Sequence, residues 1–104
     1  MPVTVVATMK AKPESVDAVR EACKQAIGAV HSEPGCDLYS LHEADGTFVF
    51  VEQWADTDAL TAHSKAPAVA TLFGTVGEHL DGAPDIKMLR PVVAGDPSKG
   101  ALRP

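Results

Sequence analysis

The segment from Glu33 to His63 constrains the fold most, because it combines two turn signals with two strand-like runs in only 31 residues. A Pro34-Gly35 pair opens it, since proline cannot extend a preceding helix and glycine accepts the left-handed conformation of a chain reversal. An Asp45-Gly46 pair then separates residues 37–43 from residues 47–54. Asp-Gly between two such runs is a strong hairpin signal, so we expect these two strands to pair antiparallel.

The second strand of this hairpin is apolar on both of its faces. Side chains alternate along a strand, so one face carries Phe48, Phe50, Glu52 and Trp54, and the other carries Val49, Val51 and Gln53. Helices on one side of a sheet leave its other side exposed, and an aliphatic sheet face in water usually marks an interface. We therefore expect two copies of the chain to face one another in a homodimer.

The segments outside the hairpin predict two more strands and two helices. Residues 3–9 are rich in β-branched side chains and predict a strand, and residues 14–32 show the spacing of an amphipathic helix. A second helix begins near Asp58 and is broken or kinked at Pro67, and residues 85–92 predict a last strand.

This order of strand, helix, two strands, helix and strand predicts a ferredoxin-like split βαβ fold of the α+β class, with helices on one face of a four-stranded antiparallel sheet. We expect one domain over residues 1–94. Residues 95–104 lack apolar periodicity and are expected to form a flexible tail or an arm laid over a partner.

Composition excludes several functional classes. The formal charge of −5 and the scattered lysines and arginines argue against binding to nucleic acid. No apolar run approaches the length of a membrane span, and the N-terminus lacks the features of a signal peptide, so the expected compartment is the cytoplasm. Cys23 and Cys36 are too few for a disulfide framework and have no zinc-ligand spacing, so we expect free thiols and no bound metal.

Four short motifs resemble the antibiotic biosynthesis monooxygenase family, whose members are small dimeric α+β barrels. They are the EPGC turn at residues 33–36, Tyr39 in the next strand, Glu52-x-Trp54 at a strand end, and Leu60-x-x-His63 in the following helix. The resemblance extends over residues 3–92. It implies oxidation of a quinol, an anthrone or a related polyphenol by O2 without flavin, haem, metal or other cofactor. The absence of phosphate-binding, zinc-protease and nucleophile-elbow motifs agrees with this expectation.

Such chemistry requires a dry aromatic pocket, a base and donors that stabilise an oxyanion. His63 is the first candidate for the base, because imidazole titrates nearest neutral pH; the alternative is a histidine that only packs between helix and sheet. Trp54 either forms a pocket wall and donates its indole N–H or belongs to the core. Tyr39 is a candidate donor to a substrate oxygen.

Further residues are candidates for substrate binding. Glu52 can act as a base if burial raises its pKa, or it can be solvated or paired with an arginine. Arg90 can neutralise a phenolate or pair with Glu52 across the sheet. Phe50, Leu72, Phe73 and Met88 are expected in the core, with some of them lining the pocket.

Two other functions remain open at this stage. The same barrel can hold a small aromatic ligand without catalysis, because a fold does not determine a function. Haem degradation ranks lower, because haem-degrading relatives place a histidine ten residues after a helical aromatic, whereas Phe73 stands ten residues after His63.

Overall fold

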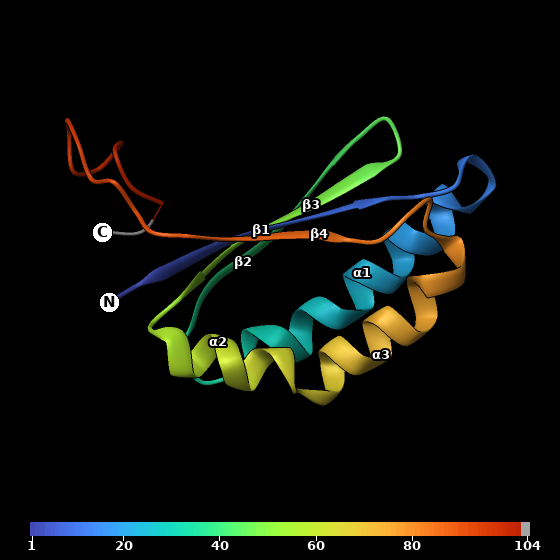
Figure 1. Ribbon diagram of the computed structural model, residues 1–104, viewed down its shortest axis with the longest axis horizontal. Coiled ribbons are helices and arrows are strands. Elements are labelled where there is room, and N and C mark those ends of the chain that lie inside the picture. Colours follow the sequence, from blue (N-terminus) through green and yellow to red (C-terminus); the bar gives the residue numbers. More distant parts are fainter. Residues whose placement is uncertain (103–104) are drawn as a thin grey trace.

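The computed structural model describes residues 1–102 and has the predicted ferredoxin-like α+β fold (Figure 1). The elements are β1 (Val3–Lys10), α1 (Val16–His31), β2 (Cys36–Ala44), β3 (Thr47–Trp54), α2 (Thr57–Ser64), α3 (Pro67–Val76) and β4 (Asp85–Leu89), with short 3-10 turns η1 (Pro13–Ser15) and η2 (Gly77–His79). The strands form one antiparallel sheet in the order β2-β3-β1-β4. All three helices lie on the same side of this sheet.

The hairpin forms as the sequence predicts. Ala44 pairs with Thr47 across a two-residue loop, and both loop residues have positive φ, 50° at Asp45 and 80° at Gly46. This backbone is the one that Asp-Gly favours between antiparallel strands, because its twist matches that of the strands. The expected division of faces on β3 is also confirmed, since Phe48, Phe50, Glu52 and Trp54 are all buried beneath the helices.

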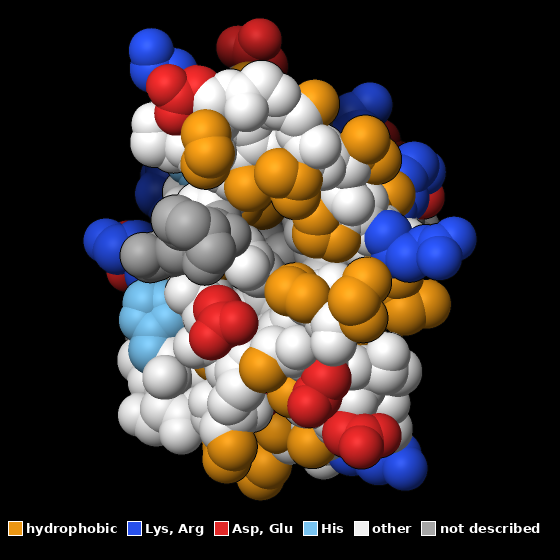
Figure 2. Space-filling view, turned by 90° about the vertical axis from the view of Figure 1, so that its left-hand side faces the viewer, with side chains coloured by type: hydrophobic (Ala, Val, Ile, Leu, Met, Phe, Trp, Pro, Cys, Tyr) orange, Lys and Arg blue, Asp and Glu red, His pale blue; other side chains and the backbone are white. Residues whose placement is uncertain are grey.

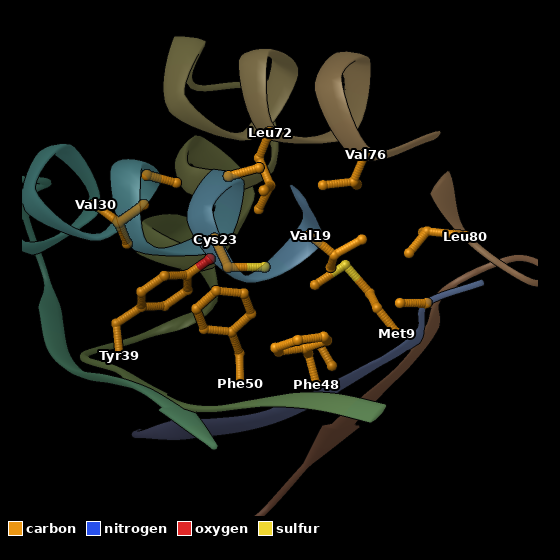
Figure 3. Packing of buried hydrophobic residues seen from close by; sticks show 14 of the residues in the cluster. Met9, Val19, Cys23, Val30, Tyr39, Phe48, Phe50, Leu72, Val76 and Leu80 are labelled. Carbon is orange, nitrogen blue, oxygen red and sulfur yellow. The ribbon is translucent and has the colours of Figure 1, made fainter. Parts of the chain in front are cut away.

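The core fills the space between the sheet and the helices (Figure 3). Val19, Cys23 and Val30 of α1 are fully buried and point toward the aromatic residues of the sheet. Register places Phe50 opposite Ala7 on β1, so a large side chain lies beside a small one and leaves space near the middle of the sheet. That space is part of the cavity described below.

The last strand is shorter than predicted. β4 ends at Leu89 rather than Val92, because Pro91 has no N–H to donate to a strand ladder. Of the two outcomes expected at Pro67, a break or a kink, the structure has the break: α2 ends at Ser64 and Pro67 begins a separate helix, α3. Residues 90–102 contain no helix or strand, and the last two residues of the predicted tail lie outside the described residues. No helix within residues 1–102 has both the length and the apolar character needed to cross a bilayer.

The sheet face opposite the helices is apolar only at its centre, because Ser40 and His42 of β2 and Asp85 and Lys87 of β4 flank its valines in the register. Val6 of β1 lies opposite Val51 of β3 on this open face, and Val49 lies two residues before Val51 on the same face. Further hydrophobic side chains are spread over the end of the molecule that carries the N-terminus and the segment after β4 (Figure 2). At this end Val92 is 86% exposed and Val93 is 66% exposed.

Candidate functional site

A cavity of about 280 Å³ lies between the sheet and the pair formed by α2 and α3. Its wall is mostly aliphatic and aromatic, with contributions from β1, β3, β4 and α3. Four polar side chains also line it: Tyr39, Glu52, His63 and Ser64. An apolar space with a few convergent polar groups is the usual form of a small-molecule site.

His63 reaches this cavity because the start of α2 is fixed. The carboxylate of Asp56 accepts a hydrogen bond from the Ala59 N–H at 2.8 Å, which caps the helix and sets its rotation. The last turn of α2 then places His63 against the sheet, where the residue is 8% exposed. The imidazole is stacked near Trp54, with 4.3 Å between ring centroids, and meets the ring of Tyr39 edge-on at 5.6 Å.

Glu52 is a buried carboxyl beside this imidazole. It lies on β3 opposite Val5, is 4% exposed, and accepts a hydrogen bond from the indole N–H of Trp54 at 2.9 Å. Its Oε1 lies 3.8 Å from Nε2 of His63. Burial raises the pKa of Glu52, and this effect exceeds the opposing effects of the Trp54 hydrogen bond and the charge of His63. The solvated and arginine-paired interpretations of Glu52 are therefore wrong.

Trp54 is a core residue rather than a wall of the cavity. Its side chain is fully buried and does not belong to the cavity lining. The interpretation of Trp54 as a pocket wall is therefore wrong. Its indole N–H is directed to Glu52 and not to the cavity. Trp54 thus holds the buried carboxyl in place and supports the imidazole ring of His63 through stacking.

Tyr39 presents its ring from β2 to the same cavity. It is 5% exposed and stacks on Phe50 with 4.4 Å between centroids, and its hydroxyl points from the sheet toward the helices (Figure 3). Burial, with the charge of Glu52 adding to it, raises the pKa of Tyr39 well above its ordinary value of 10. The phenol therefore stays protonated at neutral pH and can act as a hydrogen-bond donor, not as a base.

The other predicted binding residues divide into two groups. Phe50, Leu72 and Phe73 line the cavity. Met88 and Arg90 do not: Met88 is 70% exposed, and Arg90 is exposed beyond the end of β4. Met88 lies on the edge strand β4, whereas Arg90 follows that strand and makes no ion pair with Glu52.

The two cysteines are free thiols in the structure, as expected. Cys23 is fully buried in α1, and burial raises the pKa of its thiol to about 11. Burial together with the charge of Glu33 also raises the pKa of Cys36. Neither thiol is thus activated as a nucleophile. Within residues 1–102, His, Cys, Asp and Glu side chains form no group of three that could hold a metal ion.

Sequence reasoning missed Glu33 as a site residue. Its Oε1 lies 2.8 Å from Nδ1 of His63, although the two residues are 30 positions apart. Its other oxygen, Oε2, is buried and has no hydrogen-bond partner. The available signal was that Glu33 begins the EPGC motif, which carries part of the family resemblance.

The geometry allows one substrate oxygen to contact two site groups at once. Nε2 of His63 and Oε1 of Glu52 are too far apart to hydrogen-bond each other, and both residues face the cavity. A hydroxyl oxygen placed between them can lie about 2.8 Å from each, a normal hydrogen-bond length. The site can therefore take a proton from a hydroxyl group and stabilise the resulting anion.

Known proteins are similar to this chain in sequence and in fold. Rv0793 of Mycobacterium tuberculosis, named as a candidate monooxygenase, is 29% identical over 93 residues, which is 88% of this chain and 92% of that protein. The solved structure of Rv0793 superimposes with a TM-score of 0.85, covering 92% of this chain and 100% of that one at 28% identity.

One more solved structure and one more sequence relative are also similar to this chain. The crystal structure of a candidate antibiotic biosynthesis monooxygenase from Caulobacter crescentus has a TM-score of 0.81 at 28% identity, covering 88% of this chain and 90% of that one. An uncharacterized Synechocystis protein is 33% identical over 69 residues, which is 64% of this chain but only 47% of its own length. The family profile described as antibiotic biosynthesis monooxygenase matches residues 2–73. This chain therefore belongs to the antibiotic biosynthesis monooxygenase family.

Proposed function

We propose that the protein is a cofactor-independent monooxygenase that oxidises a small quinol with O2, with His63 as the base. The observation that supports this most is the placement of Nε2 of His63 and Oε1 of Glu52, 3.8 Å apart, at the polar side of an otherwise apolar cavity. Family membership supports the oxygenase class, and the size and lining of the cavity support the narrower proposal of a quinol substrate.

The size of the cavity favours quinols of one or two rings over three-ring anthrones. A cavity of about 150 Å³ accommodates benzene, so 280 Å³ has room for about two fused rings. Its lining residues include two aromatic rings from the sheet, Tyr39 and Phe50, against which a planar substrate can pack. None of the described residues that line it is Lys or Arg, so an uncharged phenol fits better than an anionic substrate.

The proposed reaction begins with a proton transfer. Nε2 of His63 takes the proton of a quinol hydroxyl, and Glu52 in its protonated form donates a hydrogen bond to the phenolate oxygen. The raised pKa of Glu52 increases the fraction of protein in which this carboxyl carries a proton. The Tyr39 hydroxyl is a second donor on the same wall. Donors that stabilise developing charge in a dry site are a large source of catalysis.

The electron transfers then balance without another reductant. The phenolate gives one electron to O2, and the resulting superoxide and semiquinone combine at a ring carbon as a peroxide. Cleavage of the O–O bond leaves one oxygen on that carbon and releases the other as water. The sum is quinol plus O2 to hydroxyquinone plus water. The substrate supplies all four electrons, two from the quinol-to-quinone oxidation and two from the hydroxylated C–H bond.

The proposal is tested by measuring oxygen uptake by protein that has been treated with a metal chelator. We expect uptake above the buffer rate with benzohydroquinone or naphthohydroquinone, and less with anthrone. His63→Gln should lower the rate at least about 100-fold, the usual contribution of general base catalysis. His79→Gln is the matched control, because His79 contacts Ser15 outside the cavity and should leave the rate unchanged.

Two results would contradict this function. Equal rates for wild type and His63→Gln would exclude His63 as the base. No oxygen uptake by the wild type with any quinol would exclude the proposed monooxygenase reaction. In that case, saturable binding of a quinone, followed by the fluorescence of Trp54, would identify a barrel that holds ligands without catalysis.

We also propose that two copies pair through the open face of the sheet. Val6, Val49 and Val51 form an apolar strip at its centre, and none of them is covered by a helix of the same chain. Pairing with a second sheet would remove this aliphatic strip from water. Its test is among the predictions in the Discussion.

A further inference from the structure

His63 separates the cavity from a second hollow on the outside of the molecule. This outer hollow, about 480 Å³, lies between the turn at Glu33–Gly35 and the start of α2. Among the described residues, His63 alone lines both spaces. Glu52 lines the inner cavity only, and Glu33 lines the outer hollow only. The two ring nitrogens of His63 therefore face two different acidic residues on opposite sides of one imidazole.

Glu33 is held in a rigid turn. Its N–H donates to the carbonyl of Val30 at 3.0 Å, and its carbonyl accepts from the N–H of Cys36 at 3.2 Å. The next turn residue, Gly35, has a φ of 80° and accepts a hydrogen bond from the Ala55 N–H at 2.8 Å. A Cβ on Gly35 would lie 2.5 Å from the Cβ of Ala59, so only glycine permits this close approach to α2. The approach brings the Glu33 carboxylate to His63.

The two acidic residues beside His63 contact its ring differently. Among the described residues, Glu33 is the only acidic residue in hydrogen-bond contact with the imidazole, through Nδ1, and its side chain is 16% exposed. Glu52 faces Nε2 from β3 without a hydrogen bond, and Tyr39 and Trp54 pack against the ring. Asp56 and Asp58 also line the outer hollow, but Asp56 is engaged in capping α2.

We propose that Glu33 is a positioning residue that keeps the proton of His63 on Nδ1 and exchanges protons between the imidazole and the outer hollow. The Glu33 carboxylate accepts a hydrogen bond from Nδ1–H, which leaves the lone pair of Nε2 directed toward the cavity. When Nε2 takes a proton from the substrate hydroxyl, the Nδ1 proton passes to Oε1 of Glu33. Glu33 then releases this proton to water in the outer hollow, which leaves His63 with its proton on Nε2. His63 gives that proton to the oxygen that leaves as water, and Nδ1 takes a proton back from the outer hollow through Glu33, so the starting tautomer returns. The transport part of this inference rests on the proposed function, whereas the tautomer does not.

The tautomer can be measured without substrate. Nitrogen-15 NMR of the imidazole, assigned by the loss of signals in His63→Gln, should show a proton on Nδ1 and none on Nε2 in the wild type at neutral pH. Glu33→Gln should move the proton to Nε2, because the amide can rotate and donate its N–H2 to Nδ1. Asp58→Asn, which changes charge in the same hollow without touching the ring, should leave the spectrum unchanged.

Rates test the proton transfer. With the quinol that the wild type oxidises, Glu33→Gln should lower kcat about 100-fold and change KM less than about twofold, as expected when an imidazole loses its correct tautomer. Formate should restore part of the activity of Glu33→Ala by supplying a carboxylate in the vacated hollow. Asp58→Asn should keep the wild-type kcat, with or without formate.

The outcomes separate the two proposals. A wild-type imidazole with a proton on Nε2, or a tautomer unchanged in Glu33→Gln, would overturn the positioning role whether or not the protein is an oxygenase. An active wild type with an equally active Glu33→Gln would overturn the proton transfer and leave the proposed function standing. If the wild type consumes no oxygen, the proposed function and the proton transfer both fail, and the tautomer measurement alone decides the positioning role. Urea unfolding of each variant confirms that these effects do not come from loss of the fold.

Discussion

Replacing Glu52 by glutamine should make the protein progressively more stable than the wild type as the pH rises. Burial raises the pKa of this carboxyl from its ordinary value of 4.5, so the folded state favours its protonated form. The stability that protonation gives is fully present below the unfolded-state pKa and is lost as the pH rises through the folded-state pKa. Glutamine has the same shape but never ionises, so Glu52→Gln does not lose stability in this window.

The expected size follows from the location of Glu52. Its side chain is almost completely removed from water, at 4% exposure of the residue, so the shift carries little solvent screening. Between the two pKa values, the difference in unfolding free energy between Glu52→Gln and wild type should grow by up to about 1.4 kcal/mol per pH unit, and then level off. Near pH 4 the two proteins should agree within about 1 kcal/mol, because the glutamine carbonyl still accepts the hydrogen bond from Trp54.

Urea unfolding of both proteins at each pH unit from 4 to 8 measures this difference. Glu43→Gln is a control of opposite sign. Glu43 is paired with Arg20, and the hydrogen bond from the guanidinium lowers the pKa of Glu43. The stability from Glu43 is therefore present above its unfolded-state pKa and lost as the pH falls, so Glu43→Gln should lose stability relative to the wild type as the pH rises. A flat or falling difference for Glu52→Gln would refute the assignment of a buried, destabilised carboxylate.

Two further predictions concern the turn and the open face. Gly35→Ala should lower the unfolding free energy by about 2 kcal/mol or more, because alanine is strained at a φ of 80° and its Cβ would lie 2.5 Å from that of Ala59. Gly28→Ala, with nothing within 4 Å of the added carbon in the interior of α1, should instead be neutral or gain up to about 1 kcal/mol in the same urea titration. Sedimentation should show a wild-type dimer that Val51→Lys converts to a monomer, whereas Thr71→Lys on the exposed side of α3 stays dimeric. A monomeric wild type, or a dimeric Val51→Lys, would contradict pairing through this face.

Much of the fold could be predicted because its signals are local. The Asp45-Gly46 pair specifies the hairpin through the positive φ of both loop residues, and alternation along β3 assigns each side chain to a face. Helical spacing likewise located α1. The prediction failed at the end of the last strand, which was expected to continue to Val92. β4 is an edge strand, so residues beyond Leu89 stop pairing at Pro91, and apolar content alone did not reveal this.

Some of the residues that line the cavity were predicted from the sequence, but their contacts were not. His63, Tyr39, Phe50, Leu72 and Phe73 were expected at a pocket and do line the cavity. Trp54 was placed correctly in the chain, but its indole N–H is directed to a carboxyl two residues before it on the same face of β3. Such a contact depends on side-chain rotamers and on the packing of α2, and the spacing of apolar residues along the chain predicts neither of them.

The sequence by itself determined the order of the elements, the hairpin, the two faces of β3 and the family resemblance, because each depends on neighbours within a few residues. The tertiary structure alone decided the environment of the site. The Glu33–His63 contact joins residues 30 positions apart, and it exists because the turn after α1 packs closely against α2. The raised pKa of Glu52 likewise depends on burial beneath the helices, which depends on how layers distant in the chain come together.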